Sequence, residues 1–171
     1  SDCESSAYES GEGGNKLMPN TVRENIFQNI KSALSLISVA NGFDNNIASV
    51  QQWDVNGNTL ASVPTIIVNS GPEDGSDNAY PLTTCSLKVF LTLWTRIDEG
   101  SPSAPDTVLN SLLGDIKKKL KEDITRGGNA VDTAVTSVEP FDTIEGQGEV
   151  GLVITLEVKY RHAQINPKTV M

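Results

Sequence analysis

Residues that hold metals or support nucleophilic catalysis are scarce in this sequence. The chain has two cysteines and one histidine among its 171 residues. A zinc site needs three or four Cys and His ligands, and Cys3, Cys85 and His162 stand far apart in the sequence. A catalytic histidine needs neighbouring groups that support it as a base, whereas His162 follows the last expected strand, where a solvated side chain is the ordinary case. We therefore expect no zinc site, no cofactor site and no histidine-based active site.

Basic residues, aromatic residues and long apolar runs are also few. Lys and Arg number 13 against 22 Asp and Glu, which gives a formal charge of −9, and an acidic surface gains nothing from releasing phosphate counterions. Aromatic residues make up 5%, so the core should be aliphatic. No stretch approaches the ~20 apolar residues of a membrane span, and no signal peptide is visible. We expect a soluble protein that neither enters a membrane nor holds nucleic acid.

The two cysteines indicate a reducing compartment. Cys85 falls in an apolar strand pattern, and Cys3 falls in a polar N-terminal segment. A structural disulfide between them is therefore the less favoured interpretation, and a reduced cytosolic origin is preferred.

The first 17 residues, SDCESSAYESGEGGNKL, show no hydrophobic periodicity. Such a segment buries too little apolar surface to offset its ordering entropy, so we expect residues 1–17 to be flexible. Two interpretations remain open, namely a leader ahead of Met18 and an arm that becomes ordered on a partner.

A helix is expected to begin at Thr21, because Thr21 with Glu24 three residues later is a capping-box pattern. Apolar residues then recur at three- and four-residue steps as far as Ile37, which is typical of an amphipathic helix. Asn41-Gly42 is the expected stop, since both residues tolerate a left-handed backbone.

Short strands should follow this helix. Gln51, Trp53 and Val55 share one parity, and Asn56-Gly57 after them is a frequent hairpin turn. A second β-rich run covers residues 65–68. We therefore expect these two strands to form a hairpin.

The segment SGPEDGSDNAYP, residues 70–81, is rich in turn-forming and acidic residues. It is expected to be a long acidic surface loop, a kind of segment that often carries function. The clearest strand follows as TTCSLKVFLTLWT, residues 83–95. Its odd-numbered positions from Cys85 to Leu93 are apolar and belong to the core, whereas the opposite face mixes Phe90 and Trp94 with polar residues.

A second helix is expected over residues 101–124, with Ser103 or Asp106 at its start, Pro105 in its first turn and lysines near its end. Gly127-Gly128 should end it, because a positive φ is easy for glycine. Two strands then cover residues 131–138 and 150–160, with FDTIEGQGE between them as the turn of a long hairpin.

These elements indicate one α+β domain over residues 18–165. We expect an antiparallel or mixed β-sheet with two α-helices packed on one face, followed by a C-terminal tail at residues 166–171.

Acidic residues near the glycine pair raise the question of a magnesium site for phosphoryl transfer. No pair among them has the spacing of a two-metal site, and RGGNA lacks the lysine of a phosphate-binding loop. An acidic surface is favoured, and a metal-dependent phosphoryl-transfer enzyme stays a distant alternative. The residues considered are Asp123, Asp132, Glu139, Asp142 and Glu145.

Trp53, Phe90 and Trp94 are of the type that stacks on bases. Base-stacking surfaces also carry basic residues, and here only Lys88 and Arg96 are near in sequence. Packing or subunit contact is therefore the favoured use of these aromatic side chains, and Phe90 and Trp94 are the candidate subunit-contact face.

The order of these elements, together with EDITRGGNAVD, TSVEPFDTIEGQGEVGLVITLEVKY and GSPSAPDTVLNSLLGDIKKKL, resembles the tail terminator proteins of tailed bacteriophages, a family that includes minor tail and tail-completion proteins. The resemblance covers roughly residues 18–165. Its motifs are structural, so no catalytic residue is carried over, and residues 1–17 match nothing in the family.

The resemblance implies a structural virion protein that is not an enzyme. Such proteins form a hexameric ring on the tail tube, end tube polymerisation and present a joining surface to the head connector; in contractile tails they also meet the sheath. The expected partners are therefore further copies of the chain, the tail tube protein and neck proteins. Its expected place is the head-proximal end of the virion tail, after assembly in the host cytoplasm. Another head–tail joining or tube component of the same fold is the alternative.

In such a ring the DNA passes through the lumen without specific binding. A conduit of this kind should repel DNA, and we expect Glu73, Asp74 and Asp77 of the acidic segment to face the lumen or tube.

Overall fold

The computed structural model describes residues 20–52, 62–96, 103–142 and 149–171. Trp53, Asn56-Gly57, Glu145 and Cys3 lie outside these residues. Along the chain the elements are α1 (Val22–Leu34), the 3-10 helix η1 (Val39–Asn41), β1 (Ser49–Gln52), β2 (Thr65–Asp77), β3 (Leu82–Arg96), α2 (Pro105–Glu122), β4 (Asp132–Asp142), β5 (Glu149–Ala163) and β6 (Asn166–Val170).

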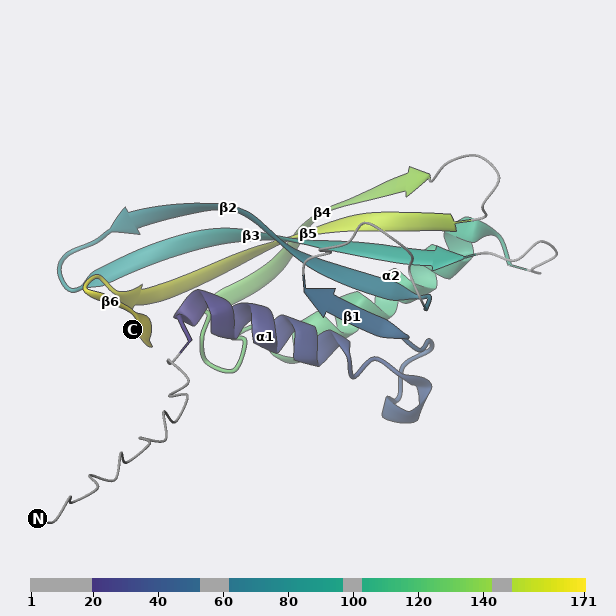
Figure 1. Cartoon of the computed structure of the whole chain (residues 1–171), viewed down its shortest axis with the longest axis horizontal. Coiled ribbons are helices and arrows are strands. Elements are labelled where there is room, and N and C mark those ends of the chain that lie inside the picture. The colour runs from purple at the N-terminus through teal and green to yellow at the C-terminus, as the bar shows by residue number, and fades with distance from the viewer. Residues whose placement is uncertain (1–19, 53–61, 97–102, 143–148) are drawn as a thin grey trace, which may run out of the picture.

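The strands form one mixed, six-stranded sheet in the order β1-β2-β3-β5-β4, with β6 beside β5 (Figure 1). This confirms the predicted α+β class. β1 runs parallel to β2, and the other pairs are antiparallel. The predicted hairpin between the first two strands is wrong, because a tight turn joins only antiparallel neighbours.

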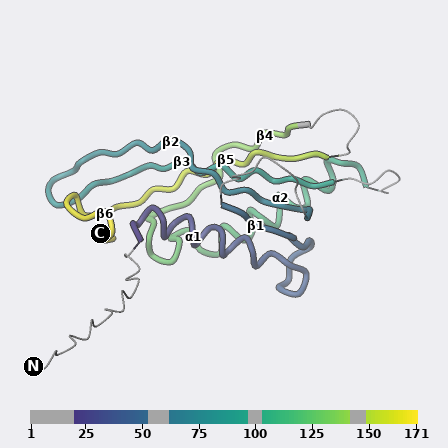
Figure 2. Tube along the Cα trace, viewed as in Figure 1, coloured from purple at the N-terminus to yellow at the C-terminus, as the bar shows by residue number. Residues whose placement is uncertain are grey.

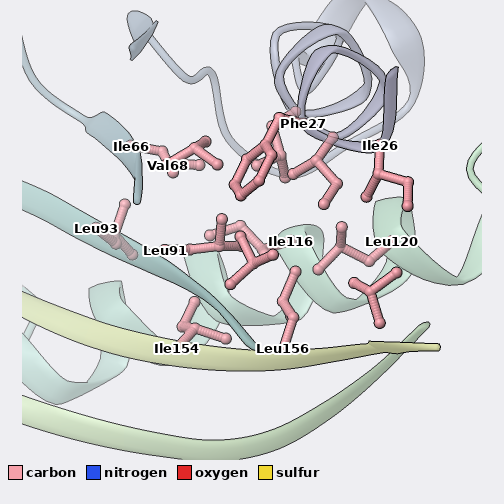
Figure 3. Packing of buried hydrophobic residues seen from close by; sticks show 14 of the residues in the cluster. Ile26, Phe27, Ile66, Val68, Leu91, Leu93, Ile116, Leu120, Ile154 and Leu156 are labelled. Atoms are coloured by element: carbon pink, nitrogen blue, oxygen red, sulfur yellow. The ribbon is translucent and has the colours of Figure 1, made fainter. Parts of the chain in front are cut away.

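Both helices pack on one face of the sheet, as predicted. Leu91 at the centre of β3, Ile26 of α1 and Ile116 of α2 are all fully buried in one apolar cluster. Figure 3 shows side chains of the strands and of the two helices filling the space between them. Full burial of an aliphatic side chain stabilises a fold by about 1.5–3 kcal/mol, so this cluster fixes the helices on the sheet.

The first helix begins where the sequence indicates and ends earlier. The Thr21 hydroxyl accepts the backbone N–H of Glu24 at 3.2 Å, and α1 ends at Leu34. There the Ser35 hydroxyl donates to the carbonyl of Lys31 at 2.9 Å, a local bond that competes with helix continuation. Gly42, at φ 83°, closes η1 instead of α1.

The expected acidic loop at residues 70–81 is wrong, because β2 continues to Asp77 and pairs with β3. A register shift between Ser70 and Glu73 accommodates the two turn-forming residues there. Beyond it the β2–β3 hairpin, with the adjoining end of β5 and with β6, extends past the start of α1 (Figures 1 and 2). We call this part, residues 73–87 and 158–170, the arm.

The second helix and the C-terminus also differ from expectation. α2 begins with Pro105 and ends at Glu122, before the glycine pair. Residues 126–128 then all adopt positive φ angles of 52°, 66° and 82° and turn the chain into β4. Residues 166–170, expected as a tail, form β6, and His162, expected beyond the last strand, lies within β5 opposite Val170.

Candidate functional site

The sheet face opposite the helices carries the predicted contact residues. Phe90 and Trp94 are half-buried there, and in the described part of the chain neither helix packs on this side. The strand register brings further apolar side chains beside them. We call this surface the open face; its apolar members are Ile67, Phe90, Trp94, Phe141 and Val153.

The aromatic rings of the open face lie over glycines. Trp94, Gly151 and Phe141 stand opposite one another on β3, β5 and β4. Because Gly151 has no side chain, the rings of Trp94 and Phe141 meet above it, with centroids 4.7 Å apart at 73°. A Cβ at Gly151 would overlap the Phe141 ring and the carbonyl of Leu93.

A second such pair lies nearer the arm. A Cβ on Gly71 would come within 2.8 Å of Cε2 of Phe90 and 2.8 Å of the carbonyl oxygen of Lys88. Phe90 therefore packs on the backbone of β2 at the start of the arm. The two aromatic–glycine pairs place large rings close to the backbone of the neighbouring strands and give the open face an apolar surface.

The three predicted acidic residues do not share one surface. Glu73 and Asp77 stand opposite Leu87 and Thr83 on β3, on the helix side, whereas Asp74 stands opposite Ser86 on the other side. All three are exposed to solvent on the arm. Their expected position at a lumen stays a prediction, and it applies to a strand, not to a loop.

Glu73 is already engaged within the chain. Its carboxylate lies 3.1 Å from Nε of Arg23 and accepts the Tyr160 hydroxyl at 3.0 Å. Arg23 also donates to the Ser70 hydroxyl. Since Ser70 and Glu73 flank the register shift in β2, Arg23 bridges it and ties the arm to the first turn of α1.

Two groups beneath Glu73, the Tyr160 hydroxyl and the Cys85 thiol, are buried and stay protonated. Burial, together with the charge of Glu73, raises the pKa of the Tyr160 hydroxyl. Burial also raises the pKa of the Cys85 thiol; a hydrogen bond with Tyr160 opposes this rise, and the charges of Glu73 and Asp77 add to it. Cys85 is a free cysteine, and its low thiolate fraction makes it a structural group.

The acidic residues near the glycine pair stabilise the turn that joins α2 to β4. Asp123 accepts hydrogen bonds from the Thr125 backbone N–H at 3.0 Å, from the Thr125 hydroxyl at 2.7 Å and from the Gly127 N–H at 2.6 Å. Burial alone would raise the pKa of the Asp123 carboxyl, but these hydrogen bonds outweigh it and lower the pKa. Asp132 accepts the N–H of Thr133 at 2.8 Å.

These carboxylates do not converge on a common point. In the described ranges no three His, Cys, Asp or Glu side chains lie close enough together to hold a metal ion. His162 places Nδ1 at 2.9 Å from the carbonyl oxygen of Ala163. No described helix is both long and apolar enough to cross a membrane.

Sequence reasoning missed a buried arginine, Arg126, in the turn between α2 and β4. Arg126 is fully buried, and its guanidinium donates to the Thr133 hydroxyl at 3.0 Å and to the Leu120 carbonyl. It thereby satisfies an unpaired carbonyl in the last turn of α2. Gly151 and Phe141 were missed as well, because their contact depends on a strand register that no local pattern shows.

Comparison with known proteins found no matching family model and no matching curated protein. Among solved structures, a chain described as the virion of a native gene transfer agent particle is similar at 11% sequence identity and a TM-score of 0.46. The similarity covers 81% of this chain and 93% of that chain.

Proposed function

We propose that this chain is a structural protein of a phage-like virion, in which copies form a ring that caps the tail tube and joins it to the head. The sequence resemblance to tail terminator proteins over residues 18–165 supports this function. The observation that carries it in the structure is the open face, where Phe90, Trp94 and Phe141 lie on the side of the sheet away from both helices.

A half-buried aromatic surface is suited to protein contact. Aromatic residues are enriched at interfaces, because they bring large apolar area at low conformational cost. A closed ring of identical subunits needs two different patches on each subunit. In this proposal the open face, with Phe90 and Trp94, is one of them.

The test is electron microscopy of the purified chain, alone and added to polymerising tail tube subunits. We expect six-fold rings and tubes that stop at a defined length with a ring on one end. Rings that bind the head connector but leave tube length unchanged would favour the neck or adaptor alternative. Magnesium-dependent hydrolysis of DNA or nucleotides, without any effect on tubes, would replace the proposal with the enzyme alternative.

The role of the open face is tested with Phe90→Ser. We expect this variant to fold and to lose ring formation and tube capping, since its side chain is only half-buried but lies in the proposed contact. Val131→Ser is the matched control, because Val131 is an exposed apolar residue away from this face. Rings formed equally well by the Phe90 variant and the control would remove the open face from the interface.

A further inference from the structure

The tip of the arm gathers exposed apolar side chains. Tyr80, in the turn between β2 and β3, is 73% exposed, and Ile165, in the turn between β5 and β6, is 80% exposed. Val170, on β6 opposite His162, and the following Met171 are also exposed. Single exposed apolar residues are normal, whereas a group of them at one place indicates a contact surface.

The two turns of the tip are joined into one rigid unit by Gln164. Its backbone N–H donates to the Pro81 carbonyl at 2.9 Å. Its side-chain amide donates to the carbonyls of Asn78 and Leu82, each at 3.2 Å. Tyr80 and Ile165 are thus presented on a preformed surface, which lowers the entropy cost of binding.

A groove of matching size lies between the two helices. It has a volume of about 230 Å³ and is lined by Ser32, Ala33 and Leu36 on the α1 side and by Glu122 and Asp123 at the end of α2. Leu36 is 53% exposed there. An apolar cavity of about 150 Å³ holds a benzene ring, so this groove has room for the side chain of Tyr80 or Ile165.

The charges around the tip and the groove are complementary. Arg161 and Lys168, on either side of Ile165 in sequence, are exposed, and no ion pair involves them in the described residues. The groove is bordered by the acidic Glu122 and Asp123 and by the basic Lys119, so its lining carries a net negative charge. Glu122 pairs with Lys119 at 2.6 Å, but its side chain is 47% exposed and remains open to a second cation.

One chain cannot bring its own tip to its own groove. The arm extends beyond the N-terminal end of α1 (Figure 1), whereas Ser32 and Leu36 lie at the other end of that helix. A 13-residue helix is about 20 Å long. The two surfaces can therefore meet only between molecules.

We propose that the arm tip of one copy of this chain docks into the α1–α2 groove of the next copy. The contact is heterologous, because each copy gives its tip to one neighbour and its groove to the other. Such contacts give a ring where the rotation between neighbours closes and an open filament where it does not. This proposal rests on the proposed function, because the contact between tip and groove would be a second contact of the ring, additional to the open face.

Cysteine cross-linking tests the contact directly. Tyr80→Cys and Ser32→Cys are made as separate single variants, each with Cys3→Ser, so that the buried Cys85 is the only other thiol in the sequence. A disulfide requires the two Cα atoms to lie within about 7 Å. Mixing the two variants under mild oxidation should give a heterodimer, and a chain carrying both substitutions should give a ladder that ends at the ring.

The matched control is Asn110→Cys, on an exposed position of α2 that does not line the groove. It should give no cross-link with Tyr80→Cys. If rings are seen by microscopy but Tyr80→Cys and Ser32→Cys do not cross-link, the tip contact is wrong and the ring function stands. If the cross-link forms but no ring appears and tubes are not capped, the contact stands and the function is wrong.

A second measurement removes the tip without adding a thiol. The double variant Tyr80→Ser with Ile165→Ser changes only exposed side chains, so its thermal unfolding should match that of the parent. Losing two large apolar side chains from a contact should raise the concentration for half-association at least about a hundredfold in sedimentation experiments. An unchanged association, or a parent chain that stays monomeric and uncross-linked at every concentration, would overturn the proposal.

Discussion

The two faces of β3 place similar residues in different surroundings. On one face Leu87, Val89, Leu91 and Leu93 are fully buried beneath the helices. On the other, Phe90 and Trp94 are as apolar but only half-buried, and they rest on glycines of neighbouring strands. The first face stabilises the fold. The second is arranged by the fold and left available, so substitutions on the two faces should separate stability from association.

The largest effect on stability is expected from Leu91→Ala. Leu91 is fully buried against both helices, so its truncation leaves a cavity and should lower the free energy of unfolding by about 2–5 kcal/mol. Urea unfolding followed by circular dichroism measures the change. The control is the neighbouring Thr92→Ala on the open face, with an expected loss below about 1 kcal/mol. Equal losses for the two variants would contradict the distinction between the faces.

A smaller loss is expected from Gly151→Ala. The added methyl group would overlap the Phe141 ring and the Leu93 carbonyl, and overpacking of this kind costs about 1–3 kcal/mol. Gly114→Ala is the control, since nothing lies within 4 Å of a Cβ there and alanine in a helix should add about 0.5–1 kcal/mol. Opposite changes in thermal midpoint are expected. A neutral Gly151→Ala would mean that the Trp94–Phe141 contact does not need the glycine.

The smallest effect at neutral pH concerns Tyr160, on the covered face. Tyr160→Phe removes the hydrogen bond to Glu73 and should cost about 1 kcal/mol. The pKa of Tyr160 is raised in the folded chain by burial, so above pH 10 the hydroxyl ionises only in the unfolded chain. Its contribution is therefore present below pH 10 and is lost above it, by up to about 1.4 kcal/mol per pH unit.

Chemical unfolding at a series of alkaline pH values measures this loss. The parent chain should lose stability more steeply than Tyr160→Phe, and lysine titration is common to both. Parallel curves would show that the Tyr160 hydroxyl ionises equally easily in the folded and unfolded chains.

Local patterns predicted those parts of the fold in which burial alternates or repeats regularly. The alternation in β3 identified its buried residues, and the Thr21–Glu24 pattern located the start of α1. The arm was missed because Gly71 and Pro72 read as a turn, whereas pairing with β3 absorbs them in an irregular register. Cross-strand packing overrides such local preferences.

The candidate site shows the same limit. The sequence placed Phe90 and Trp94 together on one face, since strand alternation is local. It could not show Phe141 above Gly151, because that contact requires the register of three strands. The separation of Asp74 from Glu73 and Asp77 depends on β2 continuing as a strand to Asp77. The contact role of Phe90 and Trp94 and the lumen role of the three acidic residues stay predictions.

The position of β5 in the sheet determines when this chain can fold. β5 lies between β3 and β4 at the centre of the sheet, although it follows both of them in the chain. During synthesis β3 can pair with β2, but its other neighbour, β5, emerges only after α2 and β4, and pairing over such a sequence separation is slow. Until β5 arrives, neither the covered core nor the Trp94–Phe141 contact over Gly151 can form. A prematurely terminated chain without β5 would keep Phe90 and Trp94 on β3 but lose the strand that joins them to Phe141, so assembly should favour chains translated through the central strand.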